Sequence, residues 1–123
     1  MKTFKKIAAQ GEIMIERIGP LPKDRATPKG YTPLPAENGV LIVGHSETGH
    51  HHCVNAKHGS VAVMDGPPEG MRILRLLVEQ ATPIEHLRPT DTHASIMLEP
   101  GEYNLRIARE YDPYEKLARQ VAD

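Results

Sequence analysis

Residues 93–110, HASIMLEPGEYNLRIARE, give the clearest indication of the fold. Two runs, 93–98 and 103–109, flank the turn sequence Glu99-Pro100-Gly101-Glu102. In this turn, Pro at the second position and Gly at the third favour a type II turn. The segment therefore predicts a β-hairpin and indicates a β-rich protein.

Further short runs of strand-forming residues precede this hairpin. β-Branched residues between turn sequences predict strands over 11–19, 40–46, 50–56 and 60–66. We also expect a strand over 71–80, MRILRLLVEQ, with a helix as the alternative, because Leu and Arg suit either state. Residues 83–88 are expected to form a short edge strand, since Pro83 has no N–H to donate to a neighbour.

Two segments differ from the strand pattern. Residues 20–39 contain five prolines and predict a long surface loop, of the kind that often contacts a partner. Near the C-terminus, Asp112, Pro113 and Glu115 predict the capped start of a helix over about 112–121. We therefore expect one domain over residues 1–123, mostly β: a small β-sandwich or open barrel with one short C-terminal helix.

The composition restricts the classes of partner and the cellular setting. The 123 residues include 15 basic and 16 acidic residues, for a net charge of -1, which argues against binding nucleic acid through phosphate contacts. Cys53 is the single cysteine, so no intrachain disulfide forms. The sequence lacks the apolar runs typical of a signal peptide or a membrane span. We expect a cytoplasmic protein, or a virion protein if the chain is phage-encoded.

One histidine-rich segment is the candidate functional site of the sequence. Four of the seven histidines lie within eight residues, His45 and His50 to His52, with Glu47 and Cys53 beside them. Imidazole and carboxylate groups are common ligands of divalent transition metals such as Zn. The candidate metal ligands are His45, Glu47, His50, His52 and the more distant His93. A solvated or pH-responsive histidine surface is the equally weighted alternative, and His58 and His86 are expected to be surface residues.

The length of the loop within this segment decides which residues share a face. A two-residue loop, Thr48-Gly49, pairs His45 with His52 and Glu47 with His50, so that all four lie on one face. A three-residue loop, 47–49, instead groups His45, His51 and Cys53 on one face and Ser46, His50 and His52 on the other. We favour the two-residue loop because it gathers one carboxylate with three imidazoles.

Several segments resemble a family of small uncharacterised bacterial and phage-encoded proteins. The matching pieces are QGEIMIERI at 10–18, GHSETGHHHCV at 44–54, HASIMLEPGEYNLRIAREYDP at 93–113 and VAD at 121–123. This resemblance implies a phage or prophage context but no particular activity. The His-x-His pair at 50 and 52 is also distantly similar to the first motif of the cupins, which hold a metal inside a small β-barrel.

The motifs leave two classes of function. The sequence has no nucleophile elbow, Gly-rich phosphate loop or Cys-x-x-Cys pair, so we assign no catalytic residue. The first expectation is a non-enzymatic structural or interaction protein, such as a phage virion or capsid-associated component, whose histidine hairpin binds metal or senses pH. The alternative is a cupin-like metal-dependent enzyme or a metal-binding regulator. The expected partner is another protein or a second copy of the chain, and neither nucleic acid nor a membrane.

Overall fold

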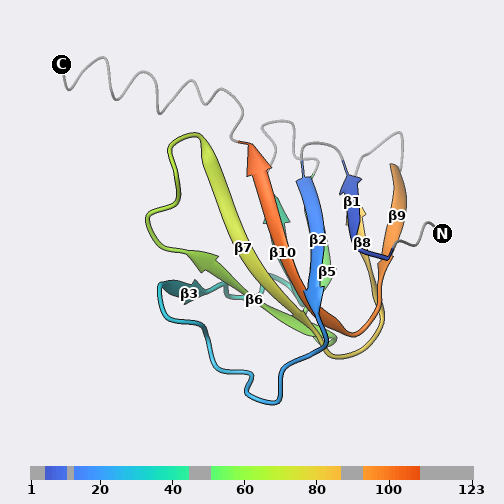
Figure 1. The fold of residues 1–123 in the computed structure, drawn as a ribbon. Helices are drawn as coiled ribbons and strands as arrows, with labels where there is room; N and C mark the ends of the chain where they lie inside the picture. The colour runs from blue at the N-terminus through green and yellow to red at the C-terminus, as the bar shows by residue number, and fades with distance from the viewer. Residues whose placement is uncertain (1–4, 11–12, 45–50, 87–92, 109–123) are drawn as a thin grey trace.

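The computed structural model describes residues 5–10, 13–44, 51–86 and 93–108, which form two antiparallel β-sheets (Figure 1). The six-stranded sheet has the order β1-β2-β10-β7-β6-β3, and the four-stranded sheet has the order β4-β5-β8-β9. The strands are β1 (Ile7–Gln10), β2 (Ile13–Gly19), β3 (Tyr31–Pro33), β4 (Val40–Gly44), β5 (His52–Asn55), β6 (Gly59–Met64), β7 (Met71–Val78), β8 (Thr82–His86), β9 (His93–Leu98) and β10 (Gly101–Ala108).

This arrangement confirms a mostly β fold, as a sandwich of two sheets and not a closed barrel of the described strands. The helix expected over 112–121 lies outside the described residues. In the described ranges, no helix is long and apolar enough to cross a membrane.

Side chains that alternate along each strand build the core between the two sheets. In β10, for example, every second residue from Gly101 to Ile107 is buried, because successive side chains in a strand point to opposite faces. The inward-facing apolar side chains come from both sheets and include Ile15, Leu74, Leu76, Tyr103, Leu105, Val43, Val54, Ile84, Ile96 and Leu98. Their removal from water is the main stabilising contribution to such a fold.

The ambiguous segment 71–80 is a strand, β7, as expected. Its register with β10 places Leu74 opposite Leu105 and Leu76 opposite Tyr103, on the inner face. Leu77 points to the outer face and is nevertheless 7% exposed, because residues of the Pro-rich segment lie against that face. Apolar residues on both faces explain why the sequence of β7 also suited a helix.

The Pro-rich segment 20–39 is not a loop throughout. Residues 31–33 form β3, which pairs with β6 at one edge of the larger sheet, with Thr32 opposite Val63. The Leu34 N–H then donates to the Val61 carbonyl at 2.8 Å, and the Leu34 side chain packs against the core. The expected loop is therefore wrong at β3, a strand that the sequence obscures because Pro28 precedes it and Pro33 ends it.

The expected hairpin over 93–109 has the right strands and the wrong pairing. β9 pairs with β8 in the smaller sheet, whereas β10 pairs with β7 and β2 in the larger one, so the chain crosses between sheets after Leu98 (Figure 1). Two contacts hold this crossing: Arg17 Nη2 donates to the Pro100 carbonyl at 3.0 Å, and the buried Tyr103 hydroxyl donates to the Glu99 carbonyl. One side chain distant in sequence, Arg17, and one nearby, Tyr103, thus stabilise the crossing.

Two other strands differ from expectation. β8 is not an edge strand, because it lies between β5 and β9. Pro83 is accommodated because β5 is in register with β8 only at Glu85 and His86, which leaves Pro83 opposite Met97 of β9 alone. β1 was not expected, and it pairs with β2 through residues such as Gln10, which lies opposite Ile13.

Candidate metal centre

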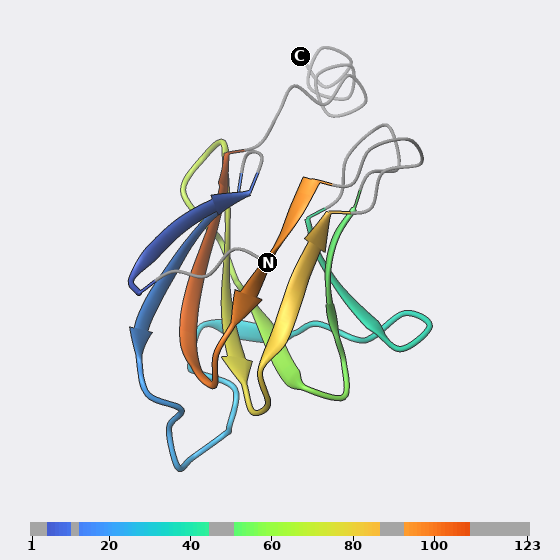
Figure 2. The same ribbon diagram turned by 90° about the vertical axis from the view of Figure 1, so that its right-hand side faces the viewer.

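Three histidines occupy neighbouring positions across three adjacent strands of the smaller sheet. The strand register pairs His52 of β5 with His86 of β8, and His86 with His93 of β9. On its other side His52 lies opposite Gly44 of β4. We call this set, Gly44–His52–His86–His93, the histidine row. Figure 2 shows the end of β8 and the start of β9 side by side at one end of the sandwich.

An irregularity in the β8–β9 ladder creates the last pair of the row. Ile84 lies opposite Ile96, so a regular ladder would bring Ala94 opposite His86. The register shifts between Ile84 and His86, and His93 takes that position instead. Bulges of this kind commonly reposition a residue at the end of a strand and recur near active sites.

A second row of residues in the larger sheet lies at the same end of the sandwich. Gln10 is opposite Ile13, Ile13 is opposite Ile107, and Ile107 is opposite Arg72. Two polar side chains of this row reach the smaller sheet. Arg72 Nη1 donates to the Val43 carbonyl at 3.1 Å, and the Gln10 side chain contacts His52.

The contact between Gln10 and His52 is fully enclosed. His52 is 0% exposed and Gln10 is 4% exposed, and both belong to the small number of buried polar residues among the described ones. The distance between His52 Nδ1 and Gln10 Oε1 is 2.9 Å. Gln10 Nε2 in turn donates to the Ile84 carbonyl at 3.0 Å. The His52 imidazole is thus held between the sheets by a hydrogen bond with Gln10 of the opposite sheet, and Gln10 is itself held by the Ile84 carbonyl.

The ligands expected from the sequence meet with different outcomes. His52 and His93 lie in the histidine row, whereas His45, Glu47 and His50 fall outside the described residues. The favoured pairing of His45 with His52 is wrong, because His52 lies opposite Gly44. The observed pairing of Gly44 with His52 is the one that the three-residue loop, 47–49, would give.

His86 is the member of the row that the sequence reasoning missed. It was expected to be an ordinary surface residue, yet its register position is between His52 and His93. Residues 83–88 carry no local signal of this role, because the place of His86 depends on the pairing of β8 with β5 and on the register shift between Ile84 and His86.

The row supplies histidines from three strands, of which the His52 imidazole is described in full. Among the side chains that the structure describes, no three His, Cys, Asp or Glu groups are close enough together to hold a metal ion. The register of β5, β8 and β9 is therefore what brings the three histidines of the row together.

Cys53 lies next to His52 but points to the other face of β5. It pairs with Ile42 and Glu85 of the neighbouring strands. Burial raises the pKa of the Cys53 thiol, and the Glu85 carboxylate raises it further. The thiol is therefore protonated at neutral pH, which favours a structural role over metal ligation or nucleophilic chemistry.

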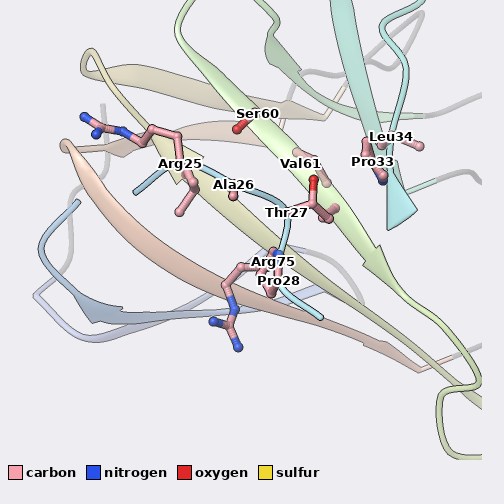
Figure 3. Close-up of a pocket in the computed structure, with 11 residues that line it drawn as sticks. Arg25, Ala26, Thr27, Pro28, Pro33, Leu34, Ser60, Val61 and Arg75 are labelled. Atoms are coloured by element: carbon pink, nitrogen blue, oxygen red, sulfur yellow. The ribbon is translucent and has the colours of Figure 1, made fainter. Parts of the chain in front are cut away.

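A separate cavity of about 150 Å³ lies between the Pro-rich segment and the outer face of β6 and β7 (Figure 3). Its two arginines interact with other groups of the protein. Arg25 donates to the Pro22 and Lys23 carbonyls and lies 3.6 Å from Glu79, while Arg75 forms an ion pair with Glu102 at 2.9 Å. This cavity has no residue in common with the histidine row.

A protein-family model described as "Domain of unknown function (DUF8820)" matches residues 9–108. The matched range contains all residues of the two rows, from Gln10 to Ile107. It also fits the resemblance to a family of uncharacterised proteins. Searches of curated proteins and of solved structures found no match.

Proposed function

The chain belongs to the DUF8820 family of domains of unknown function, and we propose from the register of its strands that it binds a divalent transition metal. The proposed ligands are the imidazoles of His52, His86 and His93. The observation that carries the proposal is the register of β5, β8 and β9, which brings these residues together although 41 positions separate the first from the last.

The dimensions of an antiparallel sheet suit this chemistry. Directly opposed residues share one face, with Cβ atoms about 4.5–5.5 Å apart. Zinc–nitrogen bonds are about 2.0–2.1 Å long, so imidazoles on neighbouring strands can reach a common ion. Imidazole ligands suit Zn, Cu, Ni and Fe. A ligand set without a thiolate disfavours soft metal ions such as Cu(I). The class of metal is therefore a divalent ion of this group, with Zn as the first choice.

Three protein ligands would leave a coordination position open. Structural zinc sites are usually closed by four protein ligands, whereas catalytic sites keep a position for water or substrate. His45 directly follows Gly44, and His50 precedes His52 by two residues, so either remains a predicted fourth ligand. Ligands from three strands favour the function of a metal-dependent enzyme or metal-binding regulator, because the residues of an active site usually come from several elements of the fold. A phage virion or other structural role stays a prediction.

Zinc titration of metal-free protein, prepared without a polyhistidine tag, tests the proposal. We expect one zinc ion per chain for the wild type, and loss of that stoichiometric binding in His52→Ala, His86→Ala and His93→Ala. His58→Ala is the matched control, because His58 lies in the β5–β6 connection, beyond the opposite end of β5. Binding that survives all three substitutions, or that His58→Ala removes, would contradict the assignment.

A further inference from the structure

The buried Gln10 side chain contacts Nδ1 of the His52 ring. We propose that Gln10 is a positioning residue: it holds His52 in the tautomer with a proton on Nδ1, so that Nε2 is the nitrogen that ligates the ion. This inference rests on the proposed metal site for its consequence, and on the hydrogen bonds of the described residues for its geometry.

The Ile84 carbonyl fixes the orientation of the Gln10 amide. A carbonyl oxygen only accepts hydrogen bonds, so the Gln10 atom 3.0 Å from Ile84 O must be the NH₂ nitrogen. The two ends of this side-chain amide cannot be exchanged without placing two oxygens in contact. Gln10 Oε1 is therefore the atom that faces His52.

The orientation of Gln10 then fixes the proton on His52. Gln10 Oε1 has lone pairs and no hydrogen, and it lies 2.9 Å from His52 Nδ1. Nδ1 must therefore donate, and in the neutral ring the lone pair is on Nε2. Histidines that ligate metals usually donate their other ring N–H to a fixed acceptor in this way, which sets the tautomer and the ring orientation.

The acceptor belongs to the opposite sheet, which links the proposed site to the N-terminal strand. Gln10 is the last residue of β1, which pairs with β2 alone among the described strands. His52 begins β5 of the other sheet, and the two side chains meet in the buried layer between them. Loss of the Gln10 amide would free the ring to change tautomer without removing any metal ligand.

The decisive experiment combines the tautomer of His52 with zinc affinity. Long-range ¹H–¹⁵N NMR spectra of the metal-free protein report which imidazole nitrogen is protonated, with the His52 signals identified by their absence in His52→Ala. We expect Nδ1 to be protonated in the wild type. In Gln10→Leu we expect a mixture of tautomers and zinc binding weakened about 10–100-fold, the usual effect of removing an outer-shell partner. Gln10→Glu keeps an acceptor for Nδ1–H and should restore both properties at least in part.

Tyr103→Phe is the matched control for stability, since it also removes a buried hydrogen bond to a backbone carbonyl, at the other end of the sandwich. It should leave zinc affinity unchanged. A wild-type His52 protonated on Nε2, or a Gln10→Leu variant that binds zinc like the wild type, overturns the positioning role while the metal site stands. A wild type that binds no zinc overturns the proposed function and with it the ligand role of His52, whereas the NMR result still decides whether Gln10 fixes the tautomer.

Discussion

Gly44 lies directly opposite His52, and the imidazole occupies the space that a side chain at residue 44 would need. A Cβ atom at this position would be 3.1 Å from His52 Cδ2 and 2.9 Å from Ile13 Cδ1. Both distances are shorter than ordinary carbon–carbon contacts. The glycine therefore allows the His52 ring to pack beside β4 within reach of Gln10.

Gly44→Ala should consequently displace the His52 ring. We expect a loss of about 1–3 kcal/mol in the free energy of unfolding, as for other overpacked sites. Zinc binding should weaken by about tenfold, the lower end of what outer-shell changes cost. Denaturant unfolding and zinc titration measure the two effects.

Gly19→Ala is the control, because a Cβ atom at Gly19 would have nothing within 4 Å. Its free energy of unfolding should stay within about 0.5 kcal/mol of the wild type. Equal behaviour of the two variants would show that the Gly44 contact is unimportant.

The Pro-rich segment should show two levels of backbone protection. The Leu34 amide donates to Val61 of β6 and should exchange slowly with solvent. Lys23 and Lys29 lie in the exposed part of the same segment and should exchange much faster. Amide hydrogen exchange followed by NMR distinguishes these residues, and uniformly fast exchange over 20–39 would show that β3 does not form.

Cys53 and Tyr103 should make the protein less stable in alkaline solution. Burial raises the pKa of each side chain above its ordinary value, which is 9.0 for the thiol and 10.0 for the phenol. Above these values the unfolded chain releases protons that the folded chain retains, so the free energy of unfolding falls as pH rises. Urea unfolding as a function of pH should show a decline beginning near pH 9, and Cys53→Ala should remove that first part. An unchanged profile in Cys53→Ala would contradict the burial of the thiol.

The strands could largely be predicted from the sequence because short apolar runs between turn sequences are a local property. Residues 40–44, 59–64 and 71–78 are such runs, and all three form strands. Pairing depends instead on distant residues. Nothing local in 93–108 reveals that β9 pairs with β8 and β10 with β2 and β7, or that Arg17 contacts the Pro100 carbonyl at the crossing, which is why a turn sequence there predicted a hairpin.

The candidate site likewise has a part that local sequence indicates and a part that depends on strand pairing. The cluster at 45–52 drew attention to His52, and His93 was recognised from its place at the start of a strand. Their meeting requires β8 to lie between β5 and β9, and it requires the irregular register that puts His93 opposite His86. Gln10 was not expected at all, since a glutamine near the N-terminus has no sequence feature that links it to residue 52.

The most direct test of the account is an anomalous X-ray diffraction experiment on crystals of the untagged protein grown with zinc. Data collected on both sides of the zinc absorption edge locate the ion independently of any assumption about its ligands. We expect one anomalous peak per chain at the histidine row, about 2.0–2.1 Å from His52 Nε2 and bonded also to His86 and His93. A histidine row without a peak, or a peak bonded to His52 Nδ1, would contradict it.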